Sequence, residues 1–173
     1  MTEIIYNSDT FTGEHCRGVF RNCISLTSSF DVTKMNNIDS YLFENCPSIT
    51  GVIDFTGKTV IPLRCLALYS DGIGASIGDL GIHIVIPSTI QIIKDRAFVL
   101  RNKSTFQADF SNCTSIGTSA FYGCTNLQLT DSAQLSKCES IGELAFANCK
   151  NFLNNINLLD LTSAKTIGRG IFV

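Results

Sequence analysis

The 173-residue chain lacks tryptophan, has three prolines and two histidines, and is poor in charge, with 16% Asp, Glu, Lys and Arg. Its formal charge of −2 gives no basic excess, so we expect no nucleic-acid partner. No run of 18 apolar residues occurs, and no basic start leads into an apolar segment. The sequence therefore predicts no membrane insertion and carries no general secretory signal.

Apolar residues make up 45% of the chain, which is enough for one domain over residues 1–173 with a sizeable core. The stretch from Ser115 to Leu127 recurs almost intact from Ser140 to Phe152. In both copies the apolar residues are spaced at steps of four, one, three and three, which predicts one face of a short helical segment. A segment this short becomes stable by stacking on copies of itself.

Phe121 lies five residues after Ile116, and we call the residue at this position of each repeat the anchor. The seven anchors are Phe20, Phe43, Leu66, Phe98, Phe121, Phe146 and Phe172. Their spacings are 23, 23, 32, 23, 25 and 26 residues, a period in the range of leucine-rich repeats. We call each repeat a coil and number the coils one to seven by their anchors.

A second set of apolar positions precedes the anchors from coil two onward. It consists of Phe30 and Val32, Ile53 and Phe55, Ile84 and Ile86, Ala108 and Phe110, Ala133 and Leu135, and Leu159 and Leu161. This alternation with period two predicts a strand with one buried face. The predicted fold is an α/β repeat solenoid, a right-handed stack of about seven strand-turn-short-helix coils with a parallel sheet on one face.

The pattern Ile-Gly-x-x-Ala-Phe-x-x-Cys-x-x-Leu at Ile116–Leu127, nearly repeated at Ile141–Phe152, resembles the BspA-like leucine-rich repeat. The first three coils depart from it, since Cys16 and Pro62 stand where the glycine is expected. The resemblance implies a surface or secreted protein that binds host or matrix partners, without enzymatic activity.

The two ends of the chain and the 32-residue spacing between the anchors of coils three and four do not follow the regular repeat. Residues 1–14 do not follow the strand pattern and are predicted to form an irregular N-terminal cap, which a solenoid requires. Residues 67–81 are predicted to be a Gly-rich inserted loop without phosphate-binding spacing, with partner contact as a secondary role. The seventh coil is expected to be an open edge that frays or is covered by another chain. The candidate residues of this assembly edge are Ile167, Ile171, Phe172 and Val173.

The eight cysteines recur at fixed repeat positions. Cys23, Cys46, Cys124 and Cys149 lie three residues after an anchor, and Cys113 and Cys138 three residues before the repeat isoleucine. Such periodicity favours buried thiols over disulfides or a zinc site. We therefore expect no metal and no cofactor.

Of the two histidines, His15 sits beside Cys16 and His83 faces outward from a predicted strand, so we expect that the protein is not an enzyme.

Polar residues border the predicted strands on their outer face. Aspartates precede the last apolar strand position and hydroxyl residues follow it: Asp31, Asp54, Asp109 and Asp160, then Thr33, Thr56, Ser111, Ser136 and Thr162. Together with His83, they are the candidate binding face. One interpretation is a stripe that receives cationic groups, sugar hydroxyls or calcium. The other, which we favour, is that these side chains satisfy local backbone groups.

Two functions follow. The first is a non-catalytic interaction or adhesion scaffold that presents its sheet face to a protein or glycan. The alternative is a structural subunit of a larger assembly, such as a virion or surface appendage, a homo- or hetero-oligomer whose C-terminal coil another chain caps. Surface exposure or virion association is implied by the resemblance alone.

Overall fold

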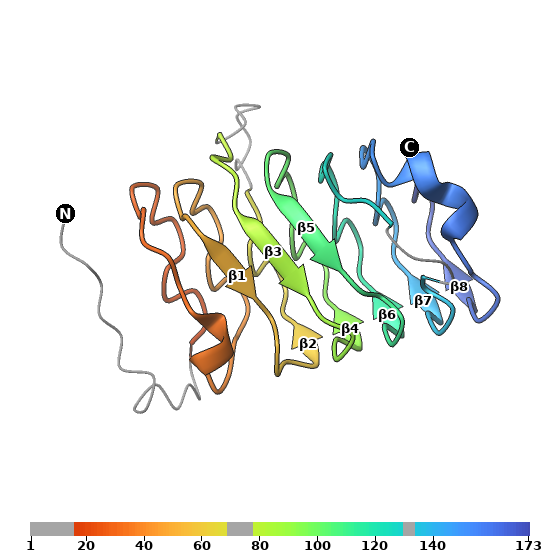
Figure 1. Cartoon of the computed structure of the whole chain (residues 1–173), viewed down its shortest axis with the longest axis horizontal. Coiled ribbons are helices and arrows are strands. Elements are labelled where there is room, and N and C mark those ends of the chain that lie inside the picture. Colours follow the sequence, from red (N-terminus) through yellow and green to blue (C-terminus); the bar gives the residue numbers. More distant parts are fainter. Residues whose placement is uncertain (1–15, 69–77, 130–133) are drawn as a thin grey trace.

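A computed structural model of the chain describes residues 16–68, 78–129 and 134–173. Successive coils stack side by side along one axis, with coil one and coil seven at opposite ends (Figure 1). The strands of neighbouring coils are parallel, which confirms the predicted repeat solenoid. The predicted cap, residues 1–14, and most of the predicted loop, residues 69–77, lie outside the described residues.

The strands form two parallel sheets rather than one. The first sheet has the order β1 (Val52–Asp54), β3 (His83–Ile86) and β5 (Thr105–Ala108). The second has the order β2 (Val60–Ile61), β4 (Ile92–Ile93), β6 (Ser115–Ile116), β7 (Ser140–Ile141) and β8 (Thr166–Ile167). Figure 1 shows them as two rows along the stack. Two short 3₁₀ helices, η1 (Val32–Lys34) and η2 (Leu153–Leu158), complete the elements of the described residues.

The second sheet corrects the sequence prediction, which placed the repeat isoleucines on a helical face. Instead, Ile61, Ile93, Ile116 and Ile141 pair in register along this sheet, and all four are buried. Isoleucine favours this setting because its branched side chain packs well on a pleated surface. The predicted first sheet is confirmed as strands at β1, β3 and β5, and in coils six and seven by a single parallel bridge between Gln134 and Leu159, while Ala133 lies outside the described residues. In coil two, the same position lies in η1.

The anchor segments are turns, not the predicted short helices. The residues two before and two after most anchors have positive φ, which interrupts the right-handed helical conformation. Those two before are Gly18, Tyr41, Arg64, Arg96, Ser119, Leu144 and Gly170, and those two after are Asn22, Asn45, Leu100, Gly123 and Asn148. The apolar spacing therefore predicted one buried face correctly, but the prediction that this face belongs to a helix was wrong.

Backbone hydrogen bonds between coils stabilise these turns. In coil five, the N–H of Ser119 donates to the carbonyl of Glu143 and that of Phe121 to the carbonyl of Ala145, each at 2.8 Å. The N–H of Gly123 makes a third such bond to coil six. The same triple recurs between every pair of coils, and we call it the turn ladder. Because the turn ladder uses groups that a helix would pair internally, it replaces the helix as the third side of each coil.

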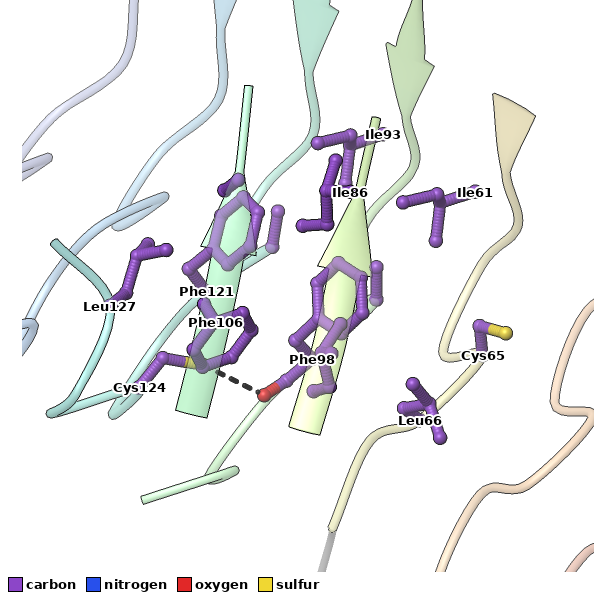
Figure 2. Packing of buried hydrophobic residues seen from close by; sticks show 14 of the residues in the cluster. Ile61, Cys65, Leu66, Ile86, Ile93, Phe98, Phe106, Phe121, Cys124 and Leu127 are labelled. Atoms are coloured by element: carbon purple, nitrogen blue, oxygen red, sulfur yellow. Dashed lines mark hydrogen bonds between the residues drawn. The ribbon is translucent and has the colours of Figure 1, made fainter. Parts of the chain in front are cut away.

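The anchors form the centre of the core. The ring of Phe121 stacks on Phe98 and Phe146, with centroids 5.0 and 5.4 Å away, and Phe106 meets it edge-on at 6.1 Å. Figure 2 shows Phe98 and Phe121 side by side, with Ile86 and Ile93 beside them. Phe121 thus buries its ring against the anchors before and after it, so a coil depends on its neighbours.

The cysteines line the core, as predicted. Seven of the eight are buried, and Cys23 is half-buried. The thiol of Cys124 donates to the carbonyl of the preceding anchor, Phe98, at 3.0 Å (Figure 2), and Cys149 bonds Phe121 in the same way at 2.9 Å. Burial raises the pKa of Cys46, Cys65, Cys113 and Cys149 to about 12. These thiols therefore remain protonated at neutral pH and act as core groups rather than nucleophiles.

Candidate functional site

The four candidate aspartates all make the same local hydrogen bond. Each Oδ1 accepts the backbone N–H of the hydroxyl residue two positions later, an arrangement known as an Asx turn. The bonds join Asp31 to Thr33 at 3.1 Å, Asp54 to Thr56 at 2.8 Å, Asp109 to Ser111 at 2.9 Å and Asp160 to Thr162 at 2.9 Å. This local role explains why aspartate returns there. The local bond occupies only part of the hydrogen-bonding capacity of each side chain, because a carboxylate offers about four acceptor sites.

Hydrogen bonding lowers the pKa of two of these carboxylates. The hydroxyl of Thr33 is the main cause that lowers the pKa of Asp31, and the backbone N–H of Thr162 is the main cause that lowers the pKa of Asp160. These bonds therefore favour the charged form of each side chain, which is also the form of an ordinary aspartate at neutral pH.

Two of the four aspartates meet at one groove beside β1. The groove has a volume of about 440 Å³ and is lined by Ser29, Asp31, Thr33, Val52 and Asp54, over the buried Phe30 and Val32. Val52 is 50% exposed, although it belongs to a strand. Lys34 lies with its Nζ 3.3 Å from Asp31 Oδ2. We call this the β1 groove; its lining combines two carboxylates, two hydroxyls and the exposed apolar side chain of Val52, with the Lys34 ammonium group paired to Asp31 outside the lining.

The other candidates lie outside this groove. The strand register sets Asp54 opposite Val85 in β3, and Val85 opposite Gln107 in β5, so Asp109 lies two residues beyond that row. Asp160 belongs to coil seven, and Ser136 follows no aspartate. Gln134, which in coil six occupies the repeat position of the aspartates, is buried, and its Oε1 accepts the N–H of Phe110 at 2.7 Å. The structure thus brings together only Asp31, Thr33 and Asp54.

His83 lies on the outer face of the first sheet and is half-buried. Its Nδ1 is 2.9 Å from the hydroxyl of Thr105 on β5. In the strand register, His83 lies opposite Val52 on β1 and opposite Thr105 on β5. Val52, His83 and Thr105 therefore form one row across the first sheet, and this row begins at the β1 groove, which Val52 lines.

The four assembly-edge candidates have different environments. Ile171 is 8% exposed, whereas Ile167 is 51% exposed and Val173 is 76% exposed. Phe172 is half-buried and packs 6.3 Å from Phe146, ring centre to ring centre. Ile167 is the exception among the repeat isoleucines of the second sheet, because Ile141 at the same position one coil earlier is 1% exposed.

Within the described ranges, no three His, Cys, Asp or Glu side chains are placed to hold a metal ion together. None of the helices there has the length and apolar character needed to cross a membrane.

Sequence reasoning missed a buried ion pair. Arg101 and Asp79 are 0% and 1% exposed, and their Nη1 and Oδ1 atoms are 3.2 Å apart. Arg101 lies three residues after its anchor, where other coils have cysteine, and this break in the pattern was a usable signal. Its partner lies in the insertion, which no repeat spacing could identify.

Comparison with known families gives six copies of the BspA type leucine rich repeat region, matching residues 4–68 and 81–173. The chain belongs to this family. BspA-type repeats commonly serve protein interaction or adhesion and are typically non-catalytic. Comparisons with curated proteins and with solved structures give no match. The BspA-type assignment therefore rests on the repeats.

Proposed function

We propose that this BspA-type solenoid is a non-catalytic recognition module that binds a protein or glycan through the β1 groove and the adjoining outer face of β1, β3 and β5. The observation that supports this most strongly is the β1 groove itself, where Asp31 and Asp54 line one concave surface with two hydroxyls. Sugar hydroxyls and cationic side chains both suit such a lining, because carboxylates accept strong hydrogen bonds from them.

The exposed Val52 supports the same site. A strand valine that is 50% exposed offers apolar contact in the middle of a polar surface, and protein and sugar partners both use such mixed contacts. The groove also adjoins the row of His83 and Thr105. The partner thus meets a continuous outer face rather than an isolated pocket.

The double substitution Asp31→Asn with Asp54→Asn tests this function. Asparagine keeps the Oδ1 acceptor of each Asx turn but removes the charge, so we expect the fold to persist. Affinity for partners found on a glycan panel and a panel of basic peptides should fall about tenfold or more, since charge-assisted hydrogen bonds are lost. Isothermal titration calorimetry measures the loss.

Asp160→Asn is the matched control, because it alters the same kind of turn outside the groove. It should leave affinity unchanged. Equal binding by the wild type and the double variant would remove the groove from the proposal, and an equal loss in all variants would show a general effect of the turns.

The second candidate, a structural subunit of an assembly, is favoured by one observation: Ile167 is 51% exposed at a position where other coils bury isoleucine. A further coil, from this protein or from another chain, would cover it.

If copies of this chain cover Ile167, light scattering across a concentration series should show a defined oligomer, and Ile167→Asp should return it to a monomer. Ile92→Asp, at an exposed isoleucine of a central coil, should leave the oligomer intact. A wild type that is monomeric throughout would contradict assembly between copies.

A further inference from the structure

Three arginines from different parts of the chain gather around one tyrosine. The Cζ atoms of Arg17, Arg21 and Arg64 lie 5.1, 5.2 and 5.8 Å from the centre of the Tyr41 ring. Arg17 and Arg21 come from coil one, Tyr41 from coil two and Arg64 from coil three. Guanidinium groups are attracted to the faces of aromatic rings, but three of them at one ring place like charges close together.

The turn ladder brings these side chains together. Tyr41 has φ +66°, and its N–H donates to the carbonyl of Leu63 in the next coil at 2.9 Å. The N–H of Gly18 donates in turn to the carbonyl of Ser40 at 3.0 Å. Coils one to three are thus fixed at hydrogen-bonding distance from one another, and their side chains next to the anchors project together.

A buried carboxylate lies beneath the arginines. Glu44 is 1% exposed, directly after its anchor, where coils three, four and six have Ala67, Val99 and Ala147. Its Oε2 accepts from Arg21 Nε, and its Oε1 accepts from Arg64 Nη1 at 3.1 Å. A buried carboxylate is costly unless it is paired, so Glu44 holds both guanidinium groups in place.

Above Glu44, the cluster forms a pocket of about 370 Å³. The described residues that line it are Arg17, Gly18, Arg21, Tyr41 and Arg64, so every charged group in this lining is cationic. Two nearby carboxylates are absent from the lining and accept backbone N–H groups instead: Asp39 from Ser40 at 2.5 Å and Asp95 from Thr118 at 2.9 Å. Counted over the described residues, the pocket therefore carries three positive charges over a single buried negative one.

We propose that this pocket binds a tetrahedral oxyanion, the sulfate or phosphate group of a ligand. Arginine suits such a group because its planar guanidinium presents several N–H donors that match the oxyanion oxygens. Inorganic sulfate or a phosphate monoester, both dianions, would balance the two surplus charges, and a sulfate monoester, a monoanion, would balance one of them. Two of the three guanidinium groups are already oriented by Glu44, so binding requires little rearrangement. This site lies on the turn side of the coils and does not depend on the function proposed for the β1 groove.

Arg17→Ala tests the site, because Arg17 takes no part in the bonds to Glu44 and is exposed. Calorimetric titration of the full chain with inorganic sulfate, and separately with inorganic phosphate, should show saturable binding. We expect Arg17→Ala to weaken it about tenfold through the loss of charge-assisted hydrogen bonds. Arg17→Lys should recover part of the affinity, since it restores the charge without the planar donors.

Arg169→Ala is the matched control, because Arg169 stands three residues before its anchor in coil seven, as Arg17 does in coil one. It should bind sulfate like the wild type. Absence of saturable binding, or equal affinity in the Arg17→Ala variant, would overturn the proposal. N-acetylglucosamine 6-sulfate and O-phosphoserine then identify the source of the anion: the ester that binds more tightly and is displaced by the inorganic ion carries the natural group.

Discussion

Asp79→Ala is expected to lower the free energy of unfolding by about 4 kcal/mol, since removal of one partner leaves the other charge buried and unpaired. Asp79 is 1% exposed and Arg101 0%. Burial already lowers the pKa of the Arg101 guanidinium, which its bond to Asp79 counteracts. Urea unfolding followed by circular dichroism measures the change.

The carboxylate of Asp79 also supports the backbone around it. Its Oδ1 accepts from Gly81 N at 3.1 Å, and its Oδ2 accepts from the N–H groups of Lys103 and Ser104 at 2.9 Å each. The Ser104 hydroxyl donates to the same Oδ2 at 3.0 Å. Alanine provides none of these acceptors, and unsatisfied buried donors add to the loss.

Arg101 explains why the pair exists. Its Nε donates to the carbonyl of the preceding anchor, Leu66, at 2.7 Å, as cysteine thiols do in other coils. Its Nη2 reaches the carbonyl of Cys46 at 3.2 Å. Arg101 thus makes the hydrogen bond that cysteine makes in other coils, but through a longer side chain. Asp79, in the insertion, supplies the opposite charge.

Two further variants define this prediction. Arg101→Met added to Asp79→Ala should recover part of the stability, since the unpaired cation is gone. Glu139→Gln breaks the exposed pair with Lys165 and should cost less than about 1 kcal/mol. A loss of that small size from Asp79→Ala would mean that the pair is not buried in solution.

The repeat period was sufficient to predict the solenoid, the buried anchors and the cysteine positions, because each is a consequence of side-chain spacing. The second sheet was missed, since two-residue strands such as β6 are too short to show alternation. The turns are more instructive. Gly18, Gly123 and Asn148 favour positive φ and were a usable signal. Arg96 and Leu144 have the same conformation with no such preference.

The conformation of Arg96 and Leu144 comes from hydrogen bonds between coils. The N–H of Arg96 donates to Thr118 O and that of Leu144 to Arg169 O, each at 2.9 Å. Left-handed backbone costs about 1–2 kcal/mol in a residue other than glycine, and the turn ladder offsets this cost. Contacts between coils also limited what the sequence could show about function. The positions of Asp31 and Asp54 were found from the sequence, but the groove that they line and the arginines around Tyr41 depend on contacts between coils.

Gly142→Ala is expected to lower the free energy of unfolding by about 3 kcal/mol, as severe overpacking does. A Cβ at Gly142 would lie 2.3 Å from Thr118 N and 2.6 Å from the carbonyl carbon of Gly117. Both are backbone atoms of coil five, so no side chain can rotate to make room. The N–H of Gly142 donates to Ile116 O at 2.7 Å, and separating the coils would stretch this bond.

The same contact recurs along the last three coils, which is why the glycine belongs to the repeat pattern there. A Cβ at Gly117 would lie 2.4 Å from Asp95 N, and one at Gly168 would lie 2.2 Å from Glu143 N. Gly78→Ala is the matched control, because no atom of the described residues lies within 4 Å of its Cβ position and its φ is not positive. It should keep or slightly raise stability, since alanine restricts the unfolded chain. Thermal and urea unfolding compare the two variants. Equal stability would show that the coils separate easily, and the close spacing of the last coils would then not be what selects glycine.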